Sequence, residues 1–388
     1  MSAPVPFRAT FAASRIADLR ARLAATHWPQ EIDHGDADTW DYGVPQGYLR
    51  DLVDYWASGF DWGAAEAFFN RHNHFVMNVD DLPIHFIHAH ADRPDAMPLL
   101  LMHGWPGSVF EFWEVIPRLT RPELYGGKAQ DAFHVVCPSL PGYGYSAPTA
   151  TRGMSPKRAA ARHDALMRQL GYDRYLVQGG NWGALVARYM PDLCSQRLIC
   201  VHYNLVLPTP PADVADLLAL LTEAERAQRA STQAHDFSVS GYSHEQVTKP
   251  QTLGIGLSDS PAGLAAWIAE KFFGWTGDNS MFLSGPGRDW LLCNISLYWM
   301  TGSIATSIRL YREYFDAIFA GDTLRVPCAV PTGITDYPAE MWRSPRSWAE
   351  REFPLVRWNA APRGGHFAAL EEPQFFAEEL WRFRKALA

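Results

Sequence analysis

The feature that most constrains the fold is an alternation of short apolar runs with helical segments in the first half of the chain. The runs predict strands at Leu99 to Met102, Phe133 to Cys137, Tyr175 to Val177 and Leu198 to His202. Segments of helical periodicity lie between them, at Ser108 to Leu119, Ser155 to Leu170 and Trp182 to Met190. Such alternation indicates an α/β fold with a mostly parallel sheet and helices on both faces.

This alternation is interrupted after Leu207-Pro208 and resumes with predicted strands at Val326 to Val330 and Leu355 to Trp358. The stretch between is helical and rich in aromatic residues, and a last helix is predicted from Phe375 to Ala388. A helical insert in a doubly wound sheet lies over the strand ends, where ligands bind. We therefore predict a first part of the core at 76–207, a helical lid at 208–320 and a second part of the core at 321–388.

The first 75 residues have helical patterns, with apolar residues on one face of Ser14 to Ala25 and of Tyr48 to Trp56. We predict a separate N-terminal helical segment over 1–75. From Phe75 the period changes to that of a strand, and Phe75 to Val79 and Ile84 to His90 predict a hairpin that turns through Asp80-Asp81.

Composition excludes some classes of function. The net charge is -8 and there is no basic run, so nucleic acid and anionic membranes are not expected as partners. The five cysteines lack metal or redox spacing and are expected to be buried thiols in a reducing compartment. With no apolar leader and no apolar stretch near the roughly 20 residues of a membrane span, we expect a cytoplasmic protein without an anchor. Its oligomeric state stays open, and a homo-oligomer is possible.

The segment Gly179-Gly180-Asn181-Trp182-Gly183 lies between a predicted strand and a predicted helix. Gly-x-nucleophile-x-Gly is the pattern of a strained turn that holds one side chain above the sheet. Asn181 occupies the nucleophile position. The same letters also fit a surface turn, because asparagine tolerates left-handed backbone angles.

Two further motifs favour the first interpretation. His103-Gly104-Trp105-Pro106-Gly107 directly follows a predicted strand, where such a loop supplies one backbone N–H of an oxyanion hole. The two donors would be the backbones of Trp105 and Trp182. His366, in Gly364-Gly365-His366, follows the last predicted strand, the place of a catalytic base. Its acid partner would be Asp336 or Glu340, and spacing does not choose between them.

Taken together, the motifs resemble those of the microsomal and juvenile-hormone epoxide hydrolases, which have the α/β-hydrolase fold. The resemblance covers nearly the whole chain, including Trp28-Pro29, and rests on four motifs in order: His103 to Ser108, Gly179 to Gly183, Tyr298-Trp299-Met300-Thr301-Gly302 and Gly364 to Ala369. The resemblance implies a soluble member without metal or cofactor that converts a small-molecule epoxide and water to a vicinal diol through an alkyl-enzyme ester. It also implies that Glu340 is the acid, and that Tyr242 and Tyr311 hold the epoxide oxygen. Detoxification, catabolism and biosynthesis all stay open as its setting.

One departure from this family is chemically serious, because the family has aspartate where this chain has Asn181. A carboxamide is neutral and its nitrogen lone pair is delocalised, so strongly reduced activity is expected. Three interpretations are open. The chain is a nucleophile mutant made to trap substrate, or it is a natural binding or regulatory relative, or His366 and Glu340 slowly hydrolyse the amide of Asn181 to a carboxylate.

Other functions are weighed against this one. A haloalkane dehalogenase shares the aspartate nucleophile and the tryptophan beside it, but it would need ring N–H groups aimed at a halide. A non-catalytic ligand-binding relative needs no nucleophile at all. The histidines His72, His74, His85, His88 and His90 look like a metal cluster. On a strand His88 and His90 share one face and His85 lies on the other, so we predict no metal site there.

Overall fold

A computed structural model describes residues 3–33, 39–211, 213–324 and 328–387. Within these ranges a nine-stranded sheet has the order β1-β2-β3-β5-β4-β6-β7-β8-β9. The strands are β1 (Val5–Phe7), β2 (His74–Val79), β3 (Leu82–Ala89), β4 (Met97–Met102), β5 (Phe133–Pro138), β6 (Tyr175–Gly179), β7 (Leu198–Tyr203), β8 (Thr332–Asp336) and β9 (Leu355–Ala360). From β5 to β9 all neighbours are parallel, which confirms the predicted sheet.

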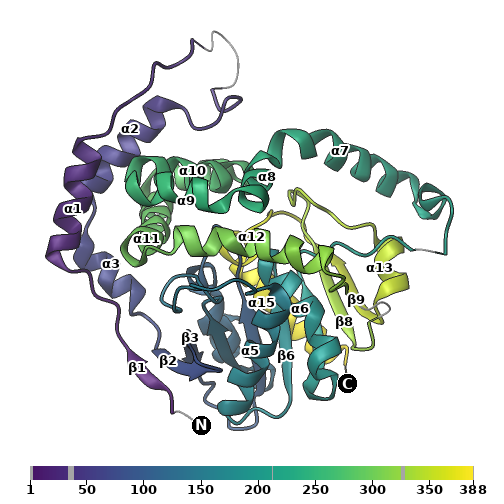
Figure 1. The fold of residues 1–388 in the computed structure, drawn as a ribbon. Helices are drawn as coiled ribbons and strands as arrows, with labels where there is room; N and C mark the ends of the chain where they lie inside the picture. Colours follow the sequence, from purple (N-terminus) through teal and green to yellow (C-terminus); the bar gives the residue numbers. More distant parts are fainter. Residues whose placement is uncertain (1–2, 34–38, 212, 325–327, 388) are drawn as a thin grey trace.

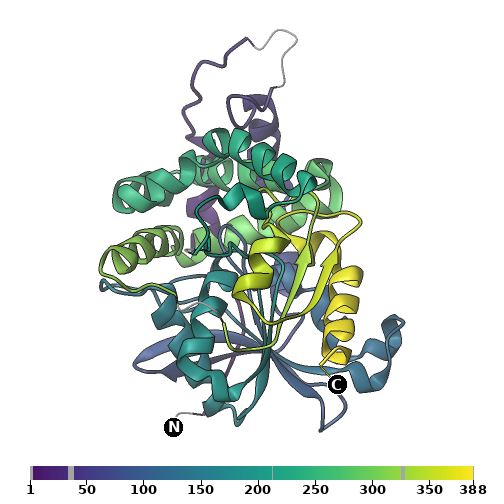
Figure 2. The ribbon, with the colours of Figure 1, turned by 90° about the vertical axis from the view of Figure 1, so that its right-hand side faces the viewer.

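Helices cover both faces of this sheet (Figure 2). On one face α5 (Pro156–Gln169) packs against α6 (Asn181–Cys194), and on the other α4 (Val115–Thr120) contacts α15 (Pro373–Lys385). The short α13 (Arg346–Glu352) and α14 (Ala368–Glu371) flank β9 along the chain. β4, β5 and β6 are almost completely buried, as their mostly apolar sequences require. The predicted helices at Ser155 to Leu170 and from Trp182 are confirmed.

Six longer helices connect β7 to β8 and lie across the carboxyl ends of the strands (Figure 1). They are α7 (Glu223–Val239), α8 (Gly241–Thr248), α9 (Pro250–Asp259), α10 (Pro261–Trp275), α11 (Gly285–Thr301) and α12 (Ile304–Phe319). α11 is buried along most of its second half, including polar Asn294 and Ser296. Residues of α8 to α12 belong to the same buried core as the sheet, so the six helices form a layer that is packed onto the carboxyl edge of the sheet from α8 onward. We call this layer the lid.

The N-terminal segment runs along one side of the molecule, from the sheet edge up to the lid (Figure 1). The helices α1 (Ala13–Ala24) and α2 (Gln46–Asp54) both contact α10, and α3 (Trp62–Phe69) follows a π-helical turn at Tyr55–Gly59. Arg22 of α1 pairs with Asp259 at 2.8 Å, and the Trp56 ring N–H donates to Ser296 of α11 at 3.0 Å. In the described part of the chain, no helix combines the length and hydropathy of a membrane span.

Three local predictions are wrong. The first 75 residues are not all helical, because β1 pairs antiparallel with β2 at the sheet edge. The predicted helix from Ser108 to Leu119 is divided into a 3-10 turn at Val109–Phe112 and α4, whose Pro117 has no N–H for a longer helix. The strand predicted at Val326 to Val330 is Thr332–Asp336 instead; residues 325–327 lie outside the described residues, and 328–330 are not in a strand.

Candidate active site

Asn181 sits at the turn from β6 into α6, with the left-handed backbone angle (φ 48°) of a strained elbow. Its side chain lines a cavity at the carboxyl edge of the sheet, so the alternative of a surface turn does not describe this position. A Cβ added to Gly104 would overlap the Asn181 side chain. Glycine at 104 is therefore required for the loop after β4 to approach the elbow this closely.

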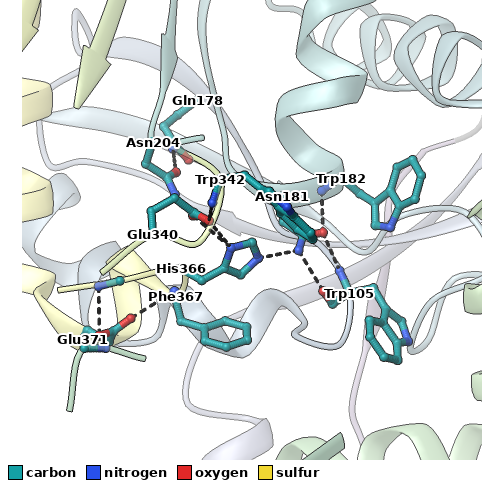
Figure 3. Close-up of polar contacts among 12 residues, drawn as sticks. Trp105, Gln178, Asn181, Trp182, Asn204, Glu340, Trp342, His366, Phe367 and Glu371 are labelled. Atoms are coloured by element: carbon teal, nitrogen blue, oxygen red, sulfur yellow. Dashed lines mark hydrogen bonds and ion pairs between the residues drawn. The ribbon is translucent and has the colours of Figure 1, made fainter. Parts of the chain in front are cut away.

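The amide of Asn181 has a hydrogen-bond partner on each side (Figure 3). Its oxygen accepts the backbone N–H of Trp105 at 3.0 Å and that of Trp182 at 2.6 Å. Its nitrogen donates to the carbonyl oxygen of Trp105 at 2.9 Å and lies 2.5 Å from Nε2 of His366. Because two N–H donors converge on one atom, that atom must be the oxygen. The backbone N–H groups of Trp105 and Trp182 thus both meet the side chain of residue 181.

His366 is held from its other side by Glu340. Its Nδ1 lies 2.9 and 3.1 Å from the two carboxylate oxygens of Glu340, and both side chains are almost completely buried. The backbone N–H of Trp342 donates to the same carboxylate at 3.2 Å. Asp336, the other acid that the spacing allowed, instead forms an ion pair with Arg343. The structure therefore brings Glu340, and not Asp336, to the histidine.

The hydrogen bonds on the two sides of His366 fit one tautomer of its ring. The N–H of Asn181 points at Nε2, so Nε2 must be the acceptor, and the ring proton lies on Nδ1, where it is donated to Glu340. A histidine with an unprotonated Nε2 that faces residue 181 is arranged as a general base.

Tyr242 and Tyr311 lie on the lid side of the same cavity, on α8 and α12. Their rings are 5.9 Å apart, and each packs against a tryptophan of the oxyanion hole: Tyr242 stacks on Trp105 at 5.3 Å and Tyr311 meets Trp182 at 4.6 Å. The two predicted lid tyrosines therefore converge with Asn181 on one space.

Burial keeps both phenols protonated. Desolvation raises the pKa of Tyr242 well above its ordinary value, and the neighbouring Tyr311 raises it further. Desolvation also raises the pKa of Tyr311, although hydrogen bonds with Trp182 and Tyr242 act in the opposite direction. Both hydroxyls are consequently neutral donors at any physiological pH.

The cavity has a volume of about 210 Å³ and an almost wholly apolar lining. Leu185, Val206, Tyr314 and Phe315 are among its other lining residues. Arg188 also borders it, but its guanidinium is engaged by the buried carboxylate of Glu352 and by the carbonyl of Leu207. No free charge therefore faces the space beside Asn181 in the described part of the chain, which suits a neutral, apolar ligand.

Sequence reasoning missed Glu371, which holds the histidine loop. Its carboxylate accepts the backbone N–H groups of Gly365 at 3.0 Å and Phe367 at 3.1 Å, on both sides of His366 (Figure 3). It also accepts that of Gly277, in the lid, at 2.7 Å. Desolvation raises the pKa of Glu371 to about 7. No motif marks this residue, because its partners are backbone groups from two distant segments.

The histidines of the N-terminal hairpin are occupied with one another. Nδ1 of His74 lies 2.7 Å from Nε2 of His85, and Nδ1 of His85 lies 2.9 Å from the Ser139 hydroxyl. His88 is bonded to Tyr172 on the other face of the hairpin. Among the described residues there is no group of three or more His, Cys, Asp or Glu side chains that could hold a metal ion.

Comparison with known proteins places these features in a family. Residues 4–112 match the family model described as the epoxide hydrolase N terminus, and residues 97–202 match that of the alpha/beta hydrolase fold. Epoxide hydrolase 1 of Oryctolagus cuniculus is 36% identical over 97% of this chain and 88% of its own length. The crystal structure of juvenile hormone epoxide hydrolase from the silkworm Bombyx mori has 34% identity and a TM-score of 0.88, with 100% of this chain and 95% of that chain covered. The epoxide hydrolase of Aspergillus niger has 30% identity and a TM-score of 0.87, over 100% and 97% of the two chains. With this fold, this site and these relatives, the chain belongs to the epoxide hydrolase family of the α/β-hydrolase fold.

Proposed function

We propose that this site is built to open a small apolar epoxide to a vicinal diol through an ester on side chain 181, and that the present amide blocks its first step. The observation that carries this proposal is the convergence on one cavity of Asn181, two neutral phenols and the His366–Glu340 pair.

With a carboxylate at position 181, the first step is a displacement at an epoxide carbon. A carboxylate oxygen forms the new C–O bond while the strained C–O bond breaks, and the charge moves to the epoxide oxygen. Tyr242 and Tyr311 supply the proton or hydrogen bonds that this oxygen needs. As neutral donors in a water-poor cavity they stabilise the alkoxide without first carrying a charge.

The second step is hydrolysis of the ester. A water molecule gives its proton to Nε2 of His366 and attacks the carbonyl carbon of the ester, and Glu340 stabilises the imidazolium that forms. The N–H groups of Trp105 and Trp182, which already hold the oxygen of Asn181, then hold the oxyanion. The ester C–O bond then breaks at the acyl carbon, the leaving oxygen takes the proton from His366, and the diol is released. None of these steps requires a metal or cofactor.

The amide interferes with the first step in two ways. Its nitrogen is a poor nucleophile because the lone pair is delocalised into the carbonyl group. Its N–H groups are also engaged, one by the carbonyl oxygen of Trp105 and the other by Nε2 of His366. A carboxylate oxygen in the same place would have no hydrogen to donate to either of these acceptors. The shape of the cavity is unaffected, so binding of an epoxide is retained while turnover is expected to be strongly reduced.

A dehalogenase is the second candidate function. One observation favours it, namely that the buried ring N–H of Trp105 has no hydrogen-bond partner within the described residues. The paired phenols favour an epoxide over a haloalkane. They can donate a proton to the oxygen of an opening epoxide, whereas a departing halide needs no proton.

The substitution Asn181→Asp tests the proposal. We expect diol formation from one or more of a panel of styrene-like, terpene-like and alkyl epoxides, on the order of a thousandfold or more above the unchanged chain. Release of chloride from haloalkanes without diol formation would favour the dehalogenase, and no turnover of either class would leave a binding protein.

A matched control is available in Asn204, a largely buried asparagine beside the elbow whose oxygen accepts from Gln178. Asn204→Asp makes the same chemical change close to residue 181 but outside the cavity. We expect it to produce no diol.

A further inference from the structure

The motif Tyr298-Trp299-Met300-Thr301-Gly302 spans the end of α11 and has no part in the steps above, although its first two residues are buried. Tyr298 is 1% exposed, and its hydroxyl donates to the carbonyl oxygen of Gly107 at 2.8 Å. Gly107 belongs to the loop after β4, residues 103–108, which supplies the Trp105 N–H to residue 181 and which we call the oxyanion loop. A lid residue is thus bonded directly to the oxyanion loop.

A second residue of the same helix contacts the same loop. Asn294, one helical turn before Tyr298 and fully buried, donates to the carbonyl oxygen of Pro106 at 2.8 Å. Its own oxygen accepts the hydroxyl proton of Ser108, also at 2.8 Å. Two side chains on one face of α11 therefore satisfy polar groups of three consecutive loop residues.

Glu111 secures the loop from the core side. The backbone groups of Gly104 and Ser108, at the two ends of the loop, act on its carboxyl in the direction that lowers its pKa. A Cβ added to Gly107 would overlap this carboxylate, so the group fills the inner side of the loop. Desolvation raises the pKa of Glu111 to about 8.

We propose that Tyr298 and Asn294 are positioning residues that lock the oxyanion loop to lid helix α11 and so hold the Trp105 N–H on the oxygen of side chain 181. Neither residue lines the cavity, and neither do Pro106 and Gly107, whose carbonyl oxygens they bind. Their effect on the reaction is indirect. A buried loop with unpaired carbonyls would move to find new partners, and a shift of an oxyanion donor by a fraction of an ångström weakens its bond to the reacting oxygen.

The consequence is specific to one step, and here the inference rests on the proposed function. Ester hydrolysis develops negative charge on the oxygen that Trp105 holds, whereas opening of the epoxide develops charge on the oxygen that the tyrosines hold. Loss of the lock is therefore expected to slow hydrolysis more than ester formation, so that the ester accumulates.

The test is Tyr298→Phe, with Tyr175→Phe as the matched control. Tyr175 is also fully buried, and its hydroxyl donates to Asp164 at 2.8 Å, at the end of β6 opposite Asn181. In the chain with Asn181, hydrogen exchange of the peptide that covers residues 103–110 is measured by mass spectrometry. We expect exchange about fivefold faster in Tyr298→Phe and unchanged in Tyr175→Phe. Equal exchange in both variants would overturn the proposal, whatever the protein does with epoxides.

The kinetic arm uses the Asn181→Asp background. We expect Tyr298→Phe to slow ester hydrolysis about tenfold with little change in the rate of ester formation, so that the enzyme–substrate adduct is visible by intact mass. Equal slowing of both steps, with a lower melting temperature, would reduce the role to stability and contradict the proposal.

If Asn181→Asp alone forms neither ester nor diol, the proposed function fails. The exchange measurement still tests whether Tyr298 holds the oxyanion loop. If Tyr298→Phe does not fold, Ser108→Ala removes the bond to Asn294 and takes its place in both arms.

Discussion

At residue 181 an amide occupies a site whose every neighbour also suits the hydrolysis of an acyl group. The amide oxygen lies between two backbone N–H donors, and the amide nitrogen lies beside an unprotonated imidazole nitrogen. Water attack on a carbonyl carbon needs an oxyanion hole and a base, and both are present. An amide is a poorer acyl donor than an ester, so the same groups should act on Asn181 slowly.

We therefore predict that Asn181 is converted to aspartate on storage of the folded protein. Water supplies the new oxygen, the Cγ–Nδ2 bond breaks, and His366 passes the proton to the departing ammonia. The measurement is peptide mass spectrometry of the segment that contains residue 181, together with the onset of diol formation over weeks. His366→Gln is the control and should keep the amide. A persistent amide in the unchanged chain after long incubation at neutral pH would contradict this prediction.

The residues that the sequence identifies are those whose role is encoded locally. Asn181 and Trp105 stand in short patterns that a strand end and a turn require. In the structure Asn181 has the left-handed backbone angle of such a turn, and the Trp105 N–H contacts its side chain. The choice of Glu340 over Asp336 rests on the family resemblance, since Asp336 ends β8 and Glu340 lies only four residues further on. Glu371 and Trp342 could not be predicted, because each acts through backbone groups that only the tertiary fold brings near.

At the scale of elements, the site depends on how closely α6 crosses β4. Gly183, in the first turn of α6, lies against the carbonyl group of Met102 at the end of β4, and an added Cβ would overlap that oxygen. The oxyanion loop begins immediately after Met102. Contact between the backbones of Gly183 and Met102 therefore holds the elbow close to this loop.

We predict that Gly183→Ala separates α6 from β4 and lowers the free energy of unfolding by about 1–3 kcal/mol, as overpacking of a close contact does. Urea denaturation followed by tryptophan fluorescence measures the change. Gly274→Ala is the matched control, because Gly274 lies exposed on α10 with open space around it, and it should be neutral or stabilising by about 0.4–1 kcal/mol. Equal unfolding midpoints for the two variants would show that the contact at Gly183 is not tight.

Strands with mostly apolar sequences could be predicted from the sequence, and a strand with a polar sequence could not. β4, β5, β6 and β7 are apolar runs in a buried parallel sheet, so hydrophobicity alone marks them. β8 has the sequence Thr-Gly-Ile-Thr-Asp, and its buried Thr332 and Thr335 are bonded to the Val330 carbonyl and to His202. Hydrophobicity therefore pointed to the apolar residues just before it.

For the whole molecule, several histidines are buried in the neutral form, and they make the free energy of unfolding depend on pH. Desolvation lowers the pKa of His74 and His103 to about 4, and that of His163 and His202 to about 3. In the unfolded chain these groups titrate near 6.5. Between pH 6.5 and 4 the unfolded chain therefore binds more protons than the folded one, so acid favours unfolding over this range.

We predict that the free energy of unfolding falls as the pH is lowered from 6.5 toward 4, by up to about 1.4 kcal/mol per pH unit for each of these histidines. The raised pKa values of Glu111 and Glu371 act in the opposite direction, but these are two groups against four histidines. Urea unfolding at pH 7, 6 and 5 at constant ionic strength measures the slope. His202→Gln should give a shallower slope than the unchanged chain. A urea midpoint that does not change between pH 7 and 5 would contradict the assignment of these histidines as neutral and buried.

The central claim is that side chain 181 is the position that attacks the epoxide, and the mass of the Asn181→Asp protein tests it most directly. The protein is mixed with an accepted epoxide, quenched within a turnover and digested. We predict an ester adduct on the peptide that contains residue 181, which decays as the diol appears and is absent from the chain with Asn181. Diol formation without an adduct at residue 181 during turnover, or an adduct on another residue, would contradict the account.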